Sequence, residues 1–194
     1  MEREALIIFI KNPVLGKAKT RIAKDVGDEK ALEIYLALLE HTRQVTSNWH
    51  GTRFLYYSDY IEPQDNWPNE LYEKRIQSDG DLGQKMFKAF QEISVDYDSV
   101  SIIGSDCYQL RLHHLEEAFS KLKTNDAVIG PSSDGGYYLL GLNQVSANLF
   151  EGVEWSTSSV SSQTVNKILQ EGMSFAQLET LTDIDHYSDW LDQI

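Results

Sequence analysis

"ALIIFIKNPVLGKAKTR", residues 5–21, joins an uncharged apolar run to a strongly basic segment. A continuous apolar run such as residues 5–10 is typical of a β-strand covered on both faces, because helices on each side of a parallel sheet remove both faces from water. The basic segment begins where this strand ends, and Pro13 and Gly16 favour a turn there. These residues therefore predict an α/β fold whose first strand leads into a basic loop.

The rest of the chain alternates between strand and helix patterns. Short apolar or β-branched runs predict strands at 52–58, 72–77, 99–104, 126–130, 137–142 and 176–184. Apolar residues at three- and four-residue intervals predict helices from residue 28, over 81–93, 113–123 and 156–169, and near the C-terminus. Strands that alternate with helices imply right-handed crossovers. We expect one domain over residues 1–194, with a mainly parallel sheet in a three-layer α/β/α arrangement.

Composition restricts the partners. The 194 residues include 17 Lys and Arg against 30 Asp and Glu, a net charge of −13, which disfavours nucleic acid because phosphates repel so acidic a chain. Cys107 is the only cysteine, so an intrachain disulfide is excluded and a cytoplasmic location is expected. The apolar run at 5–10 is too short to cross a bilayer, so membrane insertion is not predicted. The composition does not indicate an oligomeric state.

Positive charge is concentrated after the first predicted strand. Residues 11–24 carry five cations and no carboxylate. Their side chains offer donors to phosphate, and the start of a helix near Lys19 adds backbone amides; the alternative is a solvated basic turn. The segment lacks both G-x-x-x-x-G-K-[ST] and G-x-G-x-x-G, which argues against a P-loop kinase and a dinucleotide-dependent dehydrogenase. A small phosphorylated ligand is the expected occupant.

Carboxylates follow two other predicted strands. Asp106 ends a buried strand, where it could hold Mg²⁺ or Mn²⁺ against a diphosphate or cap the next helix. Asp183 and Asp185 are two residues apart, so an extended backbone points both to one side, toward one cation; the alternative is capping of the terminal helix. The neighbouring Cys107 is expected to be a small buried residue. His114, on the predicted helix after Asp106, is expected at the surface.

Glycines and aromatic residues mark a further loop. "GPSSDGGYYLLGL", residues 130–142, contains Gly135 and Gly136, which permit a close backbone approach to a ligand, and Tyr137 offers a ring and a hydroxyl beside them. The alternative is an ordinary hairpin turn. Trp155 is able to stack on a base or sugar, although a single aromatic residue is more often part of the core. Asp134 is a candidate general base from its position alone.

Six segments in this order resemble a known family: "FIKNPVLGKAKTRIA", "QSDGDLGQKM", "IIGSDCYQL", "GPSSDGGYYLLGL", "FEGVEWSTSSV" and "LTDIDHYSDW". They resemble the DUF2064 family of bacterial glycosyltransferase-like proteins over nearly the whole chain. That family is similar to phospholactate guanylyltransferases and to molybdenum-cofactor guanylyltransferases. The resemblance implies the Rossmann-like GT-A fold of nucleotide-diphospho-sugar transferases. The chain departs from the family pattern at Tyr108 and at His186-Tyr187, where proline and Thr-Pro are common, and both changes affect turn rigidity.

The resemblance also implies roles for individual residues. The nucleotide-binding set is Lys11, Gly16, Lys19 and Arg21 on the phosphates, with Gln77, Gly80 and Gly83 on the base or ribose side. The acceptor or sugar pocket is shaped by Asp134, Gly135, Gly136, Tyr137 and the nearby Trp155. The metal ligands are Asp106 with Asp183 or Asp185.

These observations predict a metal-dependent transferase that uses an activated nucleotide and a small-molecule acceptor. Glycosyl transfer from a nucleotide-sugar is the preferred reaction, on the strength of the family's name. Nucleotidyl transfer, in which a phosphorylated acceptor attacks an NTP and pyrophosphate leaves, needs the same parts. A non-catalytic nucleotide-binding protein is the alternative of another class.

Overall fold

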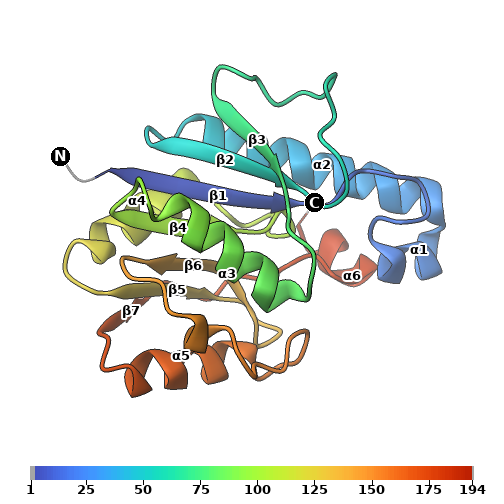
Figure 1. Cartoon of the computed structure of the whole chain (residues 1–194). Helices are drawn as coiled ribbons and strands as arrows, with labels where there is room; N and C mark the ends of the chain where they lie inside the picture. The colour runs from blue at the N-terminus through green and yellow to red at the C-terminus, as the bar shows by residue number, and fades with distance from the viewer. Residues whose placement is uncertain (1–2, 194) are drawn as a thin grey trace.

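The computed structural model describes residues 3–193 and arranges them as one sheet between two layers of helices (Figure 1). Its strands are β1 (Glu4–Ile10), β2 (Thr52–Tyr57), β3 (Tyr72–Ile76), β4 (Ser99–Ile103), β5 (Ala127–Pro131), β6 (Tyr137–Leu142) and β7 (Phe175–Gln177). Its helices are α1 (Thr20–Val26), α2 (Asp28–Ser47), α3 (Leu82–Ile93), α4 (Leu112–Leu122), the 3₁₀-helix η1 (Ala147–Leu149), α5 (Val160–Gln170) and α6 (Tyr187–Leu191).

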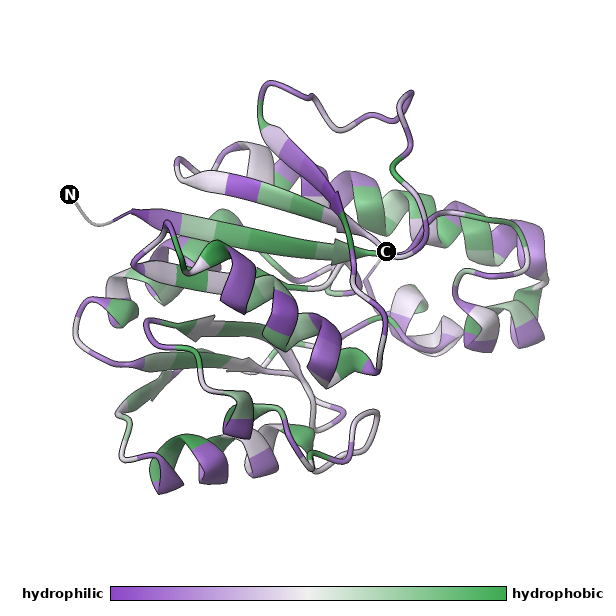
Figure 2. Ribbon diagram, in the orientation of Figure 1, coloured by the Kyte–Doolittle hydropathy of each residue, from purple (hydrophilic) through white to green (hydrophobic). Residues whose placement is uncertain are grey.

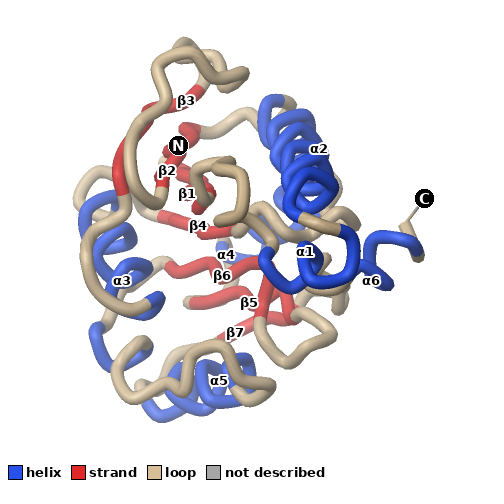
Figure 3. The backbone as a smooth tube through the Cα atoms, turned by 90° about the vertical axis from the view of Figure 1, so that its right-hand side faces the viewer, coloured by secondary structure: helices blue, strands red, loops and turns tan. Residues whose placement is uncertain are grey.

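The strands lie in the order β3-β2-β1-β4-β6-β5-β7. Strand β6 runs antiparallel to its neighbours β4 and β5, whereas all the other pairs are parallel. The prediction of a mainly parallel sheet is therefore confirmed. Parallel pairing places the ends of β1 and β4 together, because Ile8 of β1 is opposite Ile103 of β4. The loops that follow these two strands consequently meet at one edge of the sheet, which faces the viewer in Figure 3.

Each face of the sheet is covered by its own apolar layer. On one side, Leu6 and Ile8 of β1 belong to a cluster that includes Leu38 of α2 and residues of α1 and α4. On the other side, Ile7 joins Phe90 of α3 and residues of α5. The apolar colour along β1 in Figure 2 corresponds to burial on both faces. The three-layer α/β/α prediction from the run at 5–10 is thus confirmed.

Three local expectations are wrong. The last strand, expected over 176–184, is only β7, because its partner β5 ends at Pro131, which has no amide hydrogen to continue the ladder. One isolated parallel bridge, between Ser132 and Leu181, continues beyond it. The helix expected from residue 156 begins at Val160, since Ser156 has a φ of 64° and is not helical. His114, expected at the surface, is 2% exposed.

The described helices do not include one that is long and apolar enough to cross a membrane. The single-domain organisation over residues 1–194 and the cytoplasmic location stay predictions.

Candidate functional site

A cleft of about 890 Å³ opens at the edge of the sheet where β1 and β4 end. Its volume falls within the range of roughly 300–1,000 Å³ that is common for small-molecule sites. The loops after β1 and β4, the β5–β6 hairpin, residues 155–158 and residues 182–189 all contribute to its walls. This edge is where open α/β sheets bind ligands, because the loops leave the carboxyl ends of the strands there.

Most of the predicted site residues meet in this cleft. Its lining includes Lys11, Lys19, Arg21, Gln77, Asp106, Asp134, Gly136, Tyr137, Trp155, Asp183 and Asp185. Gly16, Gly80, Gly83 and Gly135 are not part of the lining within residues 3–193. These four glycines therefore shape the surrounding backbone instead of forming the wall of the cleft.

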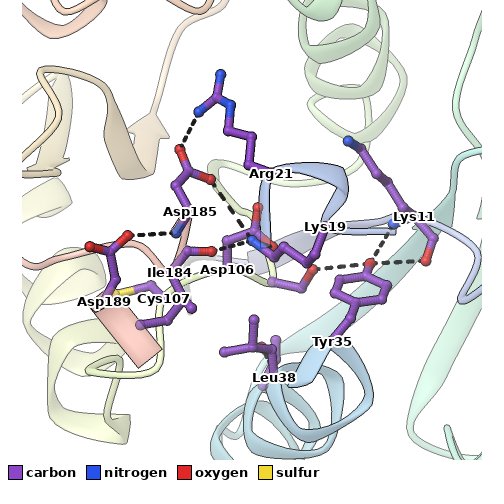
Figure 4. Close-up of polar contacts among 12 residues, drawn as sticks. Lys11, Lys19, Arg21, Tyr35, Leu38, Asp106, Cys107, Ile184, Asp185 and Asp189 are labelled. Carbon is purple, nitrogen blue, oxygen red and sulfur yellow. Dashed lines mark hydrogen bonds and ion pairs between the residues drawn. The ribbon is translucent and has the colours of Figure 1, made fainter. Parts of the chain in front are cut away.

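A lysine lies among the carboxylates of the cleft (Figure 4). Lys19 Nζ is 2.9 Å from Asp106 Oδ1 and 3.9 Å from Asp185 Oδ1, and it donates a 2.6 Å hydrogen bond to the carbonyl oxygen of Ile184. Arg21 Nη1 donates to Asp185 Oδ2 at 3.0 Å. Two of the cations that the sequence assigned to phosphate thus contact carboxylates, and the Lys19 side chain is only 7% exposed.

Backbone contacts bring the two acidic segments together. The amide of Ile184 donates to the carbonyl oxygen of Asp106 at 2.9 Å, and the amide of Thr182 donates to Gln109 Oε1 at 2.8 Å. Asp183 and Asp185 flank the first of these bonds and both line the cleft. The predicted proximity of Asp183 and Asp185 to Asp106 is therefore present, although the segment is not part of a regular strand.

Asp183 has the most perturbed carboxyl group of the site. Its burial, followed by the negative charges of Asp106, Asp134 and Asp185, raises its pKa to about 7, and the ammonium of Lys19 opposes this rise only in part. Such a group of hard oxygen donors with excess negative charge fits Mg²⁺ or Mn²⁺, which prefer oxygen ligands. The donor type of these residues therefore suits a divalent cation, although within residues 3–193 the three carboxylates do not form a group whose ligand atoms all lie within 4.8 Å of one another, and the ammonium of Lys19 lies between Asp106 and Asp185.

Another group of metal-ligating side chains lies outside the cleft, and hydrogen bonds already occupy both ring nitrogens of its buried histidine. Ligand atoms of His113, His114 and Glu179 lie within 4.8 Å of one another. However, His114 Nδ1 accepts a 2.9 Å hydrogen bond from the amide of Arg111, so the neutral ring carries its proton on Nε2, which lies 2.6 Å from Glu179 Oε1. A metal on Nε2 would displace this proton. The group instead holds the start of α4 against the segment around Glu179.

Two cations of the basic loop remain directed to solvent. The side chains of Lys11 and Lys17 are exposed at the cleft, and within residues 3–193 neither forms an ion pair. The loop is held by Tyr35 of α2, whose hydroxyl accepts from the amide of Lys11 at 2.8 Å and donates to its carbonyl oxygen at 2.9 Å. The sequence does not indicate this role of Tyr35, because its position in the apolar stripe of a helix predicts only a core residue.

Cys107, beside Asp106, is buried, and burial raises the pKa of its thiol to about 12. A thiol with so high a pKa is protonated at neutral pH and is a poor nucleophile. Its expected role as a small buried neighbour of the site is confirmed.

The loop that carries Asp134 is a tight turn between antiparallel strands, as in the hairpin alternative. Asp134 Oδ1 accepts hydrogen bonds from the amide of Gly136 at 2.9 Å and from the hydroxyl of Ser132. Gly135 has a φ of +91°, and a Cβ atom there would lie 2.0 Å from the carbonyl oxygen of Ser158. The Asp134 carboxylate therefore stabilises the turn from within, whereas Gly135 lies against Ser158 and accepts a 2.9 Å hydrogen bond from the amide of Ser161.

Replacing Gly135 by alanine is expected to destabilise the protein by about 2–4 kcal/mol, because the new methyl group combines backbone strain with a clash against Ser158. The free energy of unfolding in urea measures this loss. Gly152→Ala is the matched control, since Gly152 also has a positive φ of +66° but no atom within 4 Å of an added Cβ. Equal losses in the two variants would contradict the close approach at Ser158.

The opposite end of the cleft is apolar. Its wall includes Phe9, Leu82, Met86, Tyr137 and Trp155. Trp155 packs on Gly83 of α3, where a Cβ atom would lie 2.5 Å from the indole nitrogen, so the absence of a side chain there makes room for the ring. Gln77 donates its side-chain amide to the carbonyl oxygens of Ile10 and Tyr56, which links the ends of β1 and β2. The cleft thus has a charged end and an aromatic end.

The sequence matches a family model and is similar to a curated protein. Residues 33–157 match the family described as an uncharacterized protein conserved in bacteria, DUF2064. Over 138 residues, 71% of this chain, the sequence is 29% identical to a 2-phospho-L-lactate guanylyltransferase from Methanocaldococcus sp. (strain FS406-22). The match spans 58% of that guanylyltransferase, which is less than two thirds of its length.

Solved structures share the fold. A protein from Desulfovibrio desulfuricans G20, provisionally named a nucleotide-diphospho-sugar transferase, has a TM-score of 0.88 and 29% identity, with 96% of this chain and 84% of that chain covered. A CMP:2-keto-3-deoxy-manno-octonic acid synthetase in complex with CTP has a TM-score of 0.60 and 8% identity over 98% of this chain and 96% of that one. A likeness at such low identity concerns the fold alone. The predicted GT-A, Rossmann-like fold class is confirmed.

Proposed function

This chain belongs to the DUF2064 family, and we propose that it is a metal-dependent nucleotidyltransferase that joins the nucleotidyl group of an NTP to a small phosphorylated acceptor. One observation carries the proposal: Lys19, Asp106 and Asp185, from three distant segments, meet in a cleft at the carboxyl ends of β1 and β4. Cations for phosphate and oxygen ligands for a divalent metal are the parts that this reaction requires.

In the proposed reaction, a phosphate oxygen of the acceptor attacks the α-phosphorus of the NTP. A new P–O bond forms, the bond from the α-phosphorus to the bridging oxygen breaks, and pyrophosphate leaves with the electron pair. Lys11 and Lys17 are exposed and line the cleft, where their ammonium groups would bind the phosphates. The two hydrogen bonds between Tyr35 and the backbone of Lys11 fix the start of this loop at the end of β1.

A divalent cation is part of this proposal. Asp106, Asp183 and Asp185 would hold Mg²⁺ or Mn²⁺, which supplies charge stabilisation to the phosphate oxygens during transfer. The hydrogen bond from the Ile184 amide to the Asp106 carbonyl oxygen would keep these three residues together at the end of β4.

Nucleotidyl transfer replaces glycosyl transfer as the preferred reaction. The 29% identical relative is a guanylyltransferase, and its activity supports this choice. A phosphorylated acceptor is already ionised near neutral pH, with a second phosphate pKa of about 6, and so needs no general base. A sugar-acceptor hydroxyl generally needs one, but the candidate base Asp134 already accepts two hydrogen bonds in its turn. Glycosyl transfer remains the second candidate, because the aromatic wall with Tyr137 and Trp155 suits a sugar ring.

The test is a panel of the four NTPs with and without 2-phospho-L-lactate, and of UDP-glucose and GDP-mannose, in the presence of Mg²⁺ or EDTA. We expect pyrophosphate release from one NTP that requires both the acceptor and the metal. Release of a nucleoside diphosphate from a nucleotide-sugar would instead support glycosyl transfer. Tight NTP binding without any product would support the non-catalytic alternative, and the absence of binding would overturn all three.

A further inference from the structure

The environment of Lys19 is unusual for a lysine expected to bind a ligand. Its side chain is 7% exposed, and its ammonium contacts Asp106, Asp185 and the carbonyl oxygen of Ile184. Its backbone has φ 49° and ψ 48°, the left-handed region that residues other than glycine rarely adopt. Lys19 precedes α1 in this conformation, and in Figure 4 its side chain extends to the carboxylates, whereas the side chain of Lys11 does not reach them.

We propose that Lys19 is a built-in counter-ion of the metal site: its ammonium takes the place of the divalent cation among the carboxylates, and metal binding displaces it toward the phosphates of the nucleotide. The exchange of Lys19 with the metal does not depend on the proposed function. Only the identity of the phosphate ligand as a nucleotide rests on it. Metal and nucleotide would then bind cooperatively, because the metal releases the cation that the phosphates need.

Charge balance supports this exchange. Three acidic side chains, Asp106, Asp183 and Asp185, and two basic ones, Lys19 and Arg21, line this part of the cleft, and of the two basic groups only Lys19 is largely buried. A divalent cation bonded to Asp106 would repel an ammonium that stays within hydrogen-bond distance of the same carboxylate. Once the Lys19 ammonium leaves the carboxylates, it needs a new anionic partner. The phosphates of the nucleotide are expected on the exposed side of the same loop, near Lys17.

The first experiment measures the affinity for Mn²⁺ alone, by calorimetry or electron paramagnetic resonance. Lys19→Met is expected to bind Mn²⁺ at least about tenfold more tightly than the wild type, because the competing charge is gone. Lys17→Met is the matched control: it removes the same charge from an exposed position and is expected to change the affinity by less than about threefold. Equal or weaker Mn²⁺ binding by Lys19→Met would overturn the proposal.

The second measurement uses Mn²⁺–pyrophosphate as the probe. Lys19→Met is expected to bind this complex about tenfold more weakly than the wild type, a change opposite in sign to that for Mn²⁺ alone. A change in the same direction for both probes would contradict the exchange. Lys19→Gly repeats both measurements in a variant whose backbone tolerates a φ of 49°, in case the methionine variant does not fold.

A third readout follows Lys19 in the wild-type protein. Acetylation of its ammonium, measured by mass spectrometry, is expected to be slow without metal and faster after Mn²⁺ is added, whereas Lys17 reacts at a similar rate in both states. Unchanged protection of Lys19 in saturating Mn²⁺ would contradict displacement. The Mn²⁺-only affinities and this readout need neither an NTP nor turnover, so their result is separable from a failure of the proposed enzymatic activity.

Discussion

The Asp106→Asn variant is expected to catalyse nucleotidyl transfer about a hundredfold to a thousandfold more slowly than the wild type. Asparagine keeps the size of the side chain but removes the negative charge that Lys19 contacts at 2.9 Å and that would hold the metal. Steady-state pyrophosphate release at saturating NTP and Mg²⁺ measures the loss, and Mn²⁺ titration should show a matching loss of metal affinity.

The control for Asp106 is Asp96→Asn, an exposed carboxylate between α3 and β4 that does not line the cleft. This control should keep the wild-type rate and metal affinity. Thermal melting of both variants separates a loss of catalysis from a loss of folding, since Lys19 retains Ile184 and Asp185 as partners in Asp106→Asn. Wild-type turnover by Asp106→Asn would place the metal, or the reaction itself, elsewhere.

Asp183→Asn is expected to have opposite effects on stability and activity. The pKa of Asp183 is raised from its ordinary 3.8 to about 7, so the folded protein binds this proton more tightly than the unfolded chain does. Stability therefore falls as the pH rises from about 4 to about 7, and above pH 7 the full penalty of the ionised group remains. Without divalent cations, the variant should have a higher free energy of unfolding than the wild type. This difference should be about 1–3 kcal/mol larger at pH 8 than at pH 5.

The same variant should lose metal-dependent turnover, because it removes an oxygen donor and a charge from the proposed metal site. Urea unfolding at pH 5 and pH 8, with EDTA and with Mg²⁺, measures both parts: Mg²⁺ should stabilise the wild type and leave Asp183→Asn unchanged. Asp185→Asn is the matched comparison in the same segment. It removes the 3.0 Å contact with Arg21 and should not gain stability. A pH-independent difference between Asp183→Asn and the wild type would contradict the raised pKa.

Much of the fold follows from patterns in the sequence. The run at residues 5–10 has no polar face, which only a strand between two layers permits, and the periodic helices supply those layers. The antiparallel insertion of β6 and the early end of β7 do not follow from such patterns, because they depend on which strand edges are free and on the missing amide of Pro131.

The sequence indicates which residues form the candidate site, but not which of them contact one another. The basic loop and the carboxylates were expected near one another, since all follow strands that end at the same edge. That Lys19 contacts Asp106, while Lys11 and Lys17 face solvent, depends on the left-handed backbone at Lys19, which no local pattern indicates. The contacts of Tyr35 and His114 do not follow from the sequence either. Each residue occupies an ordinary helical position, and only the packing of distant segments determines its hydrogen-bond partners.

The hydrogen bond between Ile184 and Asp106 also determines when, during synthesis, the acidic residues of the site can come together. Residues 183–185 leave the ribosome after all seven strands, β1 to β7, so this bond forms only once every strand has been made. Two of the three proposed ligands therefore reach the sheet edge only after all seven strands have been made. If these residues hold the metal as proposed, a nascent chain would lack the complete ligand set until that point, and acquisition of metal would follow completion of the sheet.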